Sequence, residues 1–304
     1  MQSRFLGILA AASLATPAAA LDFGNSFSVK GVVELSYLSS GGGSDSSIGY
    51  GDVTLGWRSQ AGGQIGYGFD LGIVAFADLD GGDTASAVWG GLVLTTSAGD
   101  ITIGNPRPLL KTMFAPPSIG GARILDFELE TFTGSLLEFT GLADDLTTYG
   151  ISFQGTSGAL TYGASYHRLD TENADIVELV GAYAVGNTVL KAGYETIRGG
   201  GMSLDKYLLG ATYAVDRWSV GAVLSSFNLG MGDATGFRLY GDYAVTDKFK
   251  IGAQAITVDF GGSQTLYGLT GEYGFGSGGY ARLGFADVSG SSDPFYTASV
   301  GFRF

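Results

Sequence analysis

The chain has 304 residues, a formal net charge of −13 and no cysteine, so disulfide bonds and thiolate chemistry are excluded. The acidic balance argues against nucleic acid as a partner, because phosphate binding depends on clustered Lys and Arg. Glycine is frequent, at 52 residues, and only 15% of the residues are charged, yet 12% are aromatic, which argues against a disordered chain.

Residues 1–20 have the features of a cleavable export signal. Arg4 gives a basic start, an apolar stretch runs from Leu6 to Ala15, and three alanines precede Leu21. The apolar stretch is too short for a membrane span. We therefore predict that residues 1–20 are removed and that residues 21–304 form one exported domain, with an N-terminal anchor helix as the less favoured alternative.

After the signal, apolar residues recur with a period of two, which is typical of strands that have one apolar face. In the first segment Val29, Val33 and Leu35 share one face, whereas Lys30 and Glu34 share the other. Segments of this kind, bounded by Gly, Ser, Asn and Asp, predict sixteen strands. They are 26–38, 48–59, 64–79, 85–96, 100–104, 146–154, 158–168, 176–184, 188–198, 204–214, 218–228, 236–244, 248–260, 264–273, 279–288 and 294–304.

Tight turns and longer connections alternate between these strands, with both termini on the tight-turn side. Short turns at one end, longer loops at the other and an even strand number are typical of outer-membrane barrels. We therefore predict an all-β fold, a closed antiparallel transmembrane β-barrel of about 16 strands in the outer membrane of a Gram-negative bacterium. Two water-soluble β-sandwiches are the alternative, and they would normally need more charged surface.

An acidic run follows the third predicted strand. Asp78, Asp80 and Asp83 could bind Ca²⁺, because hard cations take clustered oxygen ligands. A plain acidic turn is the favoured interpretation. No cofactor is predicted for any part of the chain.

The segment from Asn105 to Asp145 spans 41 residues without a convincing strand of its own. Loops of this length in a compact domain are usually functional or disordered, and this one is rich in Pro, Leu and Phe. We predict that this long third loop folds into the lumen, because sixteen strands would otherwise leave a wide aqueous channel. A solvated acidic loop on the external surface is the alternative.

Charges in this loop and on the strands follow a pattern. Asp126, Glu128 and Glu130 share one parity, and Glu138 follows, so the loop would present a row of carboxylates. A Lys or Arg on the lipid face at mid-membrane costs about 2–4 kcal/mol. Eight basic residues lie on the parity opposite their apolar neighbours, as a lumen-facing position requires: Lys30, Arg58, Lys191, Lys206, Arg238, Lys250, Arg282 and Arg303. Because acidic residues outnumber basic ones in the loop, we expect a mild preference for cations.

The last strand ends at Phe304, with Phe302 and Tyr296 in register. Together with the signal, the sixteen strands and the long loop after the fifth strand, this pattern resembles the general porins of Gram-negative bacteria, the trimeric sixteen-stranded channels of the purple-bacterium type. The resemblance covers residues 21–304. It implies a homotrimer embedded in outer-membrane lipid and a C-terminal strand read by the barrel-assembly machinery, although Phe304 is also compatible with a simple lipid-facing aromatic.

The resemblance also implies basic wall residues opposite the acidic loop. Lys30 and Arg58 match by parity and strand number, and Arg238 and Arg282 are further candidates from later strands. Enterobacterial porins usually carry Pro-Glu-Phe-Gly in this loop, whereas the comparable stretch here is residues 126–130, Asp-Phe-Glu-Leu-Glu. Because of this departure, the resemblance does not predict which part of the barrel wall the loop tip contacts.

We therefore predict a passive diffusion channel for ions and small hydrophilic solutes, which is not an enzyme. A channel selective for sugars or oligopeptides is the first alternative, and it would need an aromatic track along the lumen. An outer-membrane hydrolase is the second, but His167, the single histidine, has no nucleophile motif beside it. An adhesive barrel, the third, would normally carry larger external loops.

Overall fold

The computed structural model describes residues 27–304, except residues 44, 60–64, 122, 124–131, 138–147, 171, 229–231 and 292, and except the side chains of Ile119 and Met202. The predicted export signal, residues 1–20, lies outside the described residues. So do the four predicted loop carboxylates, Asp126, Glu128, Glu130 and Glu138.

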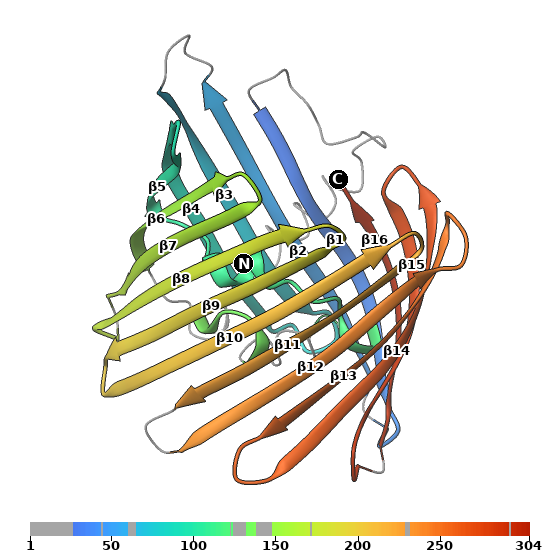
Figure 1. Cartoon of the computed structure of the whole chain (residues 1–304). Helices are drawn as coiled ribbons and strands as arrows, with labels where there is room; N and C mark the ends of the chain where they lie inside the picture. Colours follow the sequence, from blue (N-terminus) through green and yellow to red (C-terminus); the bar gives the residue numbers. More distant parts are fainter. Residues whose placement is uncertain are drawn as a thin grey trace.

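Within the described residues, sixteen antiparallel strands form one closed barrel, in which each strand pairs with its sequence neighbours and β1 pairs with β16 (Figure 1). The strands are β1 (Phe27–Ser40), β2 (Asp45–Ser59), β3 (Gly66–Asp78), β4 (Thr84–Thr96), β5 (Gly99–Asn105), β6 (Thr148–Ser157), β7 (Leu160–Leu169), β8 (Ala174–Val185), β9 (Thr188–Gly199), β10 (Met202–Val215), β11 (Trp218–Asn228), β12 (Asp233–Ala244), β13 (Phe249–Asp259), β14 (Ser263–Gly276), β15 (Gly279–Val288) and β16 (Phe295–Arg303). The predicted fold class is confirmed.

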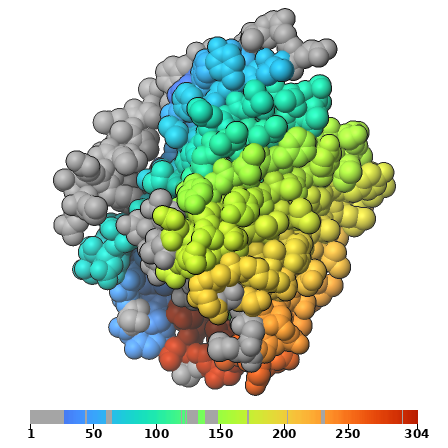
Figure 2. Space-filling model, turned by 90° about the vertical axis from the view of Figure 1, so that its left-hand side faces the viewer, coloured from blue at the N-terminus to red at the C-terminus, as the bar shows by residue number. Residues whose placement is uncertain are grey.

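The wall has two chemically different faces, because successive side chains of a strand point to opposite sides. On β10, Tyr207 and Leu209 are exposed, whereas Lys206 and Leu208 beside them are buried. We call the face with the exposed apolar residues the outer face and the opposite one the inner face. Figure 2 shows one side of the outer face, on which the green to yellow residues form oblique bands. Closure leaves no unpaired sheet edge, which a hydrocarbon environment demands.

Two arginines depart from the predicted segregation of basic residues to the inner face. Arg168 and Arg198 share the parity of exposed outer-face residues and lie at the ends of β7 and β9 away from the chain termini. Each is paired with an aspartate of the next strand, Arg168 with Asp175 at 2.9 Å and Arg198 with Asp205 at 2.6 Å. Charges on the lipid side cost little near a membrane interface, so this position is tolerable.

In its described part, the connection between β5 and β6, which we call the β5–β6 connection, contains short helical elements. Helix α2 (Leu109–Met113) follows Pro108, and the 3-10 helix η1 is Ile119–Gly121. Sequence analysis predicted no helix at either of these two places. No helix among the described residues has the length and apolarity needed to cross a membrane.

Candidate functional site

The β5–β6 connection touches the inner face at widely separated strands. Helix α2 contacts β7, β8 and β9, and η1 contacts β13 to β16. Further along, the Arg123 guanidinium lies 5.2 Å from the ring centre of Tyr50 on β2. The ring of Phe132 then lies 5.3 Å from that of Phe227 on β11. Contacts with strands on several sides of a closed barrel place these described parts against the inner face.

The first anchor of the connection is a row of inner-face side chains that are direct partners across β7 to β10. Ser165 is opposite Glu178, Glu178 is opposite Glu195, and Glu195 is opposite Lys206. Glu178, Glu195 and Lys206 are completely buried. We call these four residues the buried row.

Glu178 and Glu195 hold two parts of the connection that are distant in sequence. The backbone N–H of Leu109 donates to Glu178 Oε2 at 2.7 Å, and that of Leu136 donates to Glu195 at 3.1–3.2 Å. The Ser135 hydroxyl oxygen lies 3.1 Å from Glu178 Oε1 and 3.2 Å from Glu195 Oε1. The two carboxylates therefore bind the start and the later part of the connection side by side.

Lys206 and His167 flank this pair. Lys206 Nζ donates to the Gly134 carbonyl at 2.5 Å and lies 3.5 Å from Glu195 Oε2. His167, also fully buried, has its Nε2 atom 3.8 Å from Glu178 Oε2. The strand position of His167 faces the inner side of the barrel, where the side chain is enclosed by its surroundings. A histidine so enclosed cannot serve as the base of a hydrolase that acts on an external substrate.

Two further anchors use the arginines that sequence analysis proposed as pore residues. Arg238 Nη2 donates to the Pro117 carbonyl at 2.6 Å and to Gln254 Oε1 at 2.9 Å. Arg282 Nη2 donates to Glu34 at 2.7 Å, and Arg282 Nη1 donates to the Gly121 carbonyl at 3.3 Å. Arg238 is 1% exposed and Arg282 is 5% exposed, so both are largely buried against the connection, although Arg282 also borders the smaller cavity described below.

Wall glycines allow the connection to come close. A Cβ atom added at Gly284 would lie 1.7 Å from the Gly120 carbonyl oxygen, and one added at Gly193 would lie 2.4 Å from Leu110 Cδ2. Gly120 itself has a φ of 57°, which favours glycine. At Gly284 a larger residue would push the backbone of the connection away from the wall, whereas at Gly193 the Leu110 side chain would have to shift.

Apolar contacts complete the attachment. Leu136 and Leu137 join a buried cluster that includes Tyr50, Phe76 and Trp89. These inner-face aromatic rings are therefore buried beside the connection, although Trp89 also borders the cavity described next.

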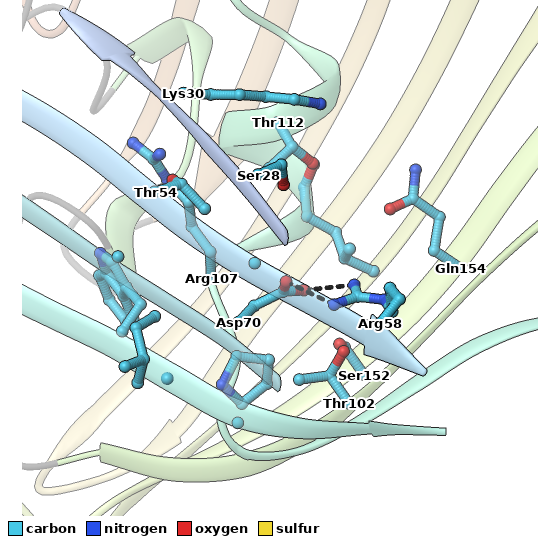
Figure 3. Close-up of a pocket in the computed structure, with 18 of the residues that line it drawn as sticks. Ser28, Lys30, Thr54, Arg58, Asp70, Thr102, Arg107, Thr112, Ser152 and Gln154 are labelled. Atoms are coloured by element: carbon cyan, nitrogen blue, oxygen red, sulfur yellow. Dashed lines mark hydrogen bonds and ion pairs between the residues drawn. The ribbon is translucent and has the colours of Figure 1, made fainter. Parts of the chain in front are cut away.

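The sector from β1 to β6 is different, because it borders a cavity of about 840 Å³ (Figure 3). Lys30, Arg58 and Asp70 line it from β1 to β3, and Arg107 lines it from the connection. Six uncharged polar side chains complete the hydrophilic lining: Ser28, Thr54, Thr102, Thr112, Ser152 and Gln154. The structure thus brings Lys30 and Arg58 to one cavity, away from Arg238 and Arg282.

The charges of this cavity are mostly paired. Arg58 donates two hydrogen bonds to Asp70, both at 2.8 Å, as Figure 3 shows, and Asp100 lies 3.9 Å from it. Arg107 donates two to Asp52, at 2.9 and 2.7 Å. Among the described residues no carboxylate lies within 4.0 Å of the Lys30 ammonium, and this side chain is exposed.

A second, smaller cavity of about 130 Å³ lies between the connection and β12 to β16. Its charged lining is also paired. Arg303 donates two hydrogen bonds to Glu272, at 2.8 and 2.6 Å, and Lys250 lies 3.6 Å from Asp242. The inner wall therefore carries alternating cations and carboxylates on both sides of β1.

The predicted Ca²⁺ candidates serve as backbone acceptors in a turn. Asp78 Oδ1 accepts the N–H of Asp80 at 2.9 Å, and Asp80 Oδ2 accepts the N–H of Ser47 at 2.6 Å. In the part of the chain that the structure describes, no group of three or more His, Cys, Asp or Glu side chains could hold a metal ion, and this includes Asp83. The acidic run therefore has the geometry of a turn.

The predicted assembly signal lies at the seam that closes the barrel. Phe304 exchanges backbone hydrogen bonds with Gly31 at 2.8 and 3.0 Å, and its ring centre is 6.0 Å from that of Phe302. Tyr296 is 53% exposed on the outer face. This geometry places the three aromatics on or beside the last strand, and their recognition by assembly machinery stays a prediction.

Sequence analysis missed the roles of Glu178, Glu195 and Lys206. The parity of Lys206 predicts an inward position, but nothing in the alternation shows which inner-face residues a long connection will cover. One available signal was the presence of two like charges, Glu178 and Glu195, at positions that face each other on adjacent strands.

Comparison with known proteins agrees with this architecture. The sequence model of the Gram-negative porin family matches residues 7–293. No curated protein gives a significant match over its sequence.

Solved porin structures share the fold. A porin refined at 1.8 Å resolution is 17% identical, with a TM-score of 0.69, over 91% of this chain and 100% of that one. A mutant of the porin of Rhodobacter blastica is also 17% identical, with a TM-score of 0.65 and the same coverage. OmpT, an outer membrane protein of Vibrio cholerae solved in a trimer form, is 14% identical, with a TM-score of 0.67, over 91% of this chain and 99% of that one.

The family match spans most of the chain, and the closed sixteen-stranded barrel has the apolar outer face and polar inner face that such a protein requires. The resemblance found from the sequence is confirmed. The chain belongs to the Gram-negative porin family and is an integral β-barrel channel protein of the outer membrane.

Proposed function

We propose that this protein is a passive diffusion channel for ions and small hydrophilic solutes, narrowed by the β5–β6 connection. One observation carries the proposal: a barrel with an apolar outer face encloses a cavity of about 840 Å³ lined by hydroxyl, amide and charged side chains. A solute that crosses such a space exchanges its hydration water for these polar groups, which requires no covalent chemistry and no cofactor.

The narrowing follows from how firmly the connection is held. Three sets of inner-face contacts, at β8 to β10, β12 to β13 and β15 to β16, fix its described parts against the wall. A fixed segment inside a wide barrel reduces the aperture to a solute-sized opening. The described wall residues Lys30 and Arg58 are the proposed basic side of that opening.

The acidic side of the opening is proposed to be Asp126, Glu128, Glu130 and Glu138, as the sequence predicts. Support comes from the overall acidity of the chain, with its net charge of −13, and from the nearly balanced charges of the described cavity. A mild preference for cations follows. Reconstitution in a planar bilayer with a salt gradient tests this: the reversal potential should indicate cation preference, and the opposite sign would refute it.

A homotrimer is the proposed assembly, supported by the family and by the trimer form of the similar Vibrio cholerae protein. Outer-membrane lipid would surround the assembly, and the barrel-assembly machinery would recognise the strand that ends at Phe304. Stepwise conductance changes in groups of three, together with a trimer mass in native mass spectrometry, are the expected results. A monomer that conducts with single steps would contradict the trimer but leave the channel intact.

A further inference from the structure

The channel function does not determine how many protons the two carboxyl groups of the buried row carry. Glu178 and Glu195 face each other directly across β8 and β9, and both are fully buried. Two neighbouring carboxylates removed from water do not both stay ionised without compensation, so one of them tends to keep a proton.

The hydrogen bonds of Ser135 point to the same conclusion. Its hydroxyl oxygen lies within hydrogen-bond distance of both carboxylates and also accepts the Leu137 N–H at 3.2 Å. A serine hydroxyl carries a single hydrogen, so it can donate to only one carboxylate. The contact with the other carboxylate becomes a hydrogen bond only if that carboxyl group supplies a proton.

Among the described residues, the titratable groups beside the pair are His167 on β7, 3.8 Å from Glu178, and Lys206 on β10, 3.5 Å from Glu195. The described residues of the connection that touch the pair offer only a hydroxyl group and backbone N–H groups. A positive Lys206 offsets one carboxylate charge, and a shared proton removes the other.

We propose that Glu178 and Glu195 are positioning residues of the channel, which share one proton and thereby hold the β5–β6 connection in its conducting position. This inference rests on the proposed channel function. With the proton present, the pair binds Leu109, Ser135 and Leu136 at the same time. When the proton leaves to solvent at alkaline pH, two adjacent buried negative charges repel each other, and the two bound parts of the connection separate from the wall.

Two measurements on the purified full-length protein test this. Infrared spectroscopy at neutral pH should detect one protonated carboxyl group that is lost in the Glu178→Gln and Glu195→Gln variants. Single-channel recording should show interruptions of the current that become more frequent as pH rises, by up to about tenfold for each unit once the proton begins to leave. In Glu195→Gln, whose amide cannot ionise, the frequency should not change with pH.

Asp242→Asn is the matched control, because Asp242 is an inner-face carboxylate paired with Lys250 on β13. It should keep both the infrared band and the wild-type response to pH. Loss of the alkaline response in this control as well would overturn the assignment to the buried row. So would a neutral-pH spectrum without a protonated carboxyl group, which would mean that both carboxylates are ionised.

The two readouts also separate this inference from the proposed function. If the folded wild-type protein passes no current at any pH, the channel function fails, while the infrared band still reports the shared proton. If the protein conducts and the band is present, but interruptions are equally frequent at every pH, the positioning role fails alone.

Discussion

Two sectors of the inner wall carry the same kinds of charged side chain but differ in how far these side chains are buried. On β8 to β10, Glu178, Glu195 and Lys206 are completely buried, whereas on β1 to β3 Lys30, Arg58 and Asp70 border an 840 Å³ cavity. Parity places all six on the inner face. The difference is the β5–β6 connection, which covers the first sector and leaves the second open to water.

The comparison shows that an inward-facing charge in a barrel does not by itself line a pore. Burial changes its energetic role. Removing one partner of a buried ion pair leaves an uncompensated charge and is strongly destabilising, whereas an exposed pair contributes little because water screens it. The covered sector should therefore govern stability and the position of the connection, and the open sector should govern ion preference.

The largest effect is expected at Lys206. Lys206→Met keeps most of the side-chain volume but leaves Glu195 without its buried cation, so the barrel should lose about 3–5 kcal/mol of unfolding free energy. Urea unfolding in detergent, followed by the loss of the heat-resistant folded band on a gel, measures this. A loss comparable with that of the exposed pair of Arg58 would break the distinction between the sectors.

A covered glycine is the next test. Gly284→Ala would place a Cβ atom 1.7 Å from the Gly120 carbonyl oxygen, and since backbone cannot yield cheaply, we expect a cost of about 1–3 kcal/mol and an altered conductance. Gly72→Ala is the control on the open sector, where the nearest atom is Thr54 Oγ1 at 3.6 Å, an ordinary contact. Equal conductance for both variants would contradict the placement of the connection.

Arg58→Gln probes the open sector. Its pair with Asp70 is about one-third exposed on each side, so the unfolding free energy should fall by only about 0–1 kcal/mol. The loss of one positive charge at the cavity should shift the reversal potential toward stronger cation preference. A large destabilisation with no shift would place Arg58 in a structural role.

The smallest effect on stability is expected at Lys30, which has no carboxylate within 4.0 Å among the described residues. Lys30→Gln should leave the free energy of unfolding unchanged and still strengthen the preference for cations.

Arg238→Gln is the matched comparison, because it removes the same charge from a position under the connection. It should lower the free energy of unfolding and leave the reversal potential nearly unchanged. The reverse outcome for these two variants would restore Arg238 as a pore residue.

The strands could be predicted from the sequence because their signal is local. An alternation of apolar and polar residues located all sixteen, and only their ends moved, by up to three residues. For example, β2 begins at Asp45 rather than at residue 48. The alternation of apolar and polar residues does not extend over Ser46, Ser47 and Gly49, so it gave no signal for the earlier start. Paired neighbours, not side-chain pattern, decide how far such an end extends.

The interior could be predicted only in part, because the path of a long connection depends on distant contacts. Parity and resemblance predict Lys30 and Arg58 as basic wall residues of the pore constriction, and in the structure both line the cavity. Arg238 and Arg282 had the same parity, yet the carbonyl groups of Pro117 and Gly121 cover them. No local pattern distinguishes an arginine that faces water from one that binds a loop folded over it.

The most direct test uses the absence of cysteine from the natural sequence. Thr54→Cys introduces a thiol on the open sector, and Ser165→Cys introduces one in the buried row under the connection. During a bilayer recording, a charged water-soluble thiol reagent should reduce the current through Thr54→Cys channels and leave Ser165→Cys channels unaffected. Equal modification of both positions, or modification of position 165 alone, would contradict the division of the lumen into a covered and an open sector.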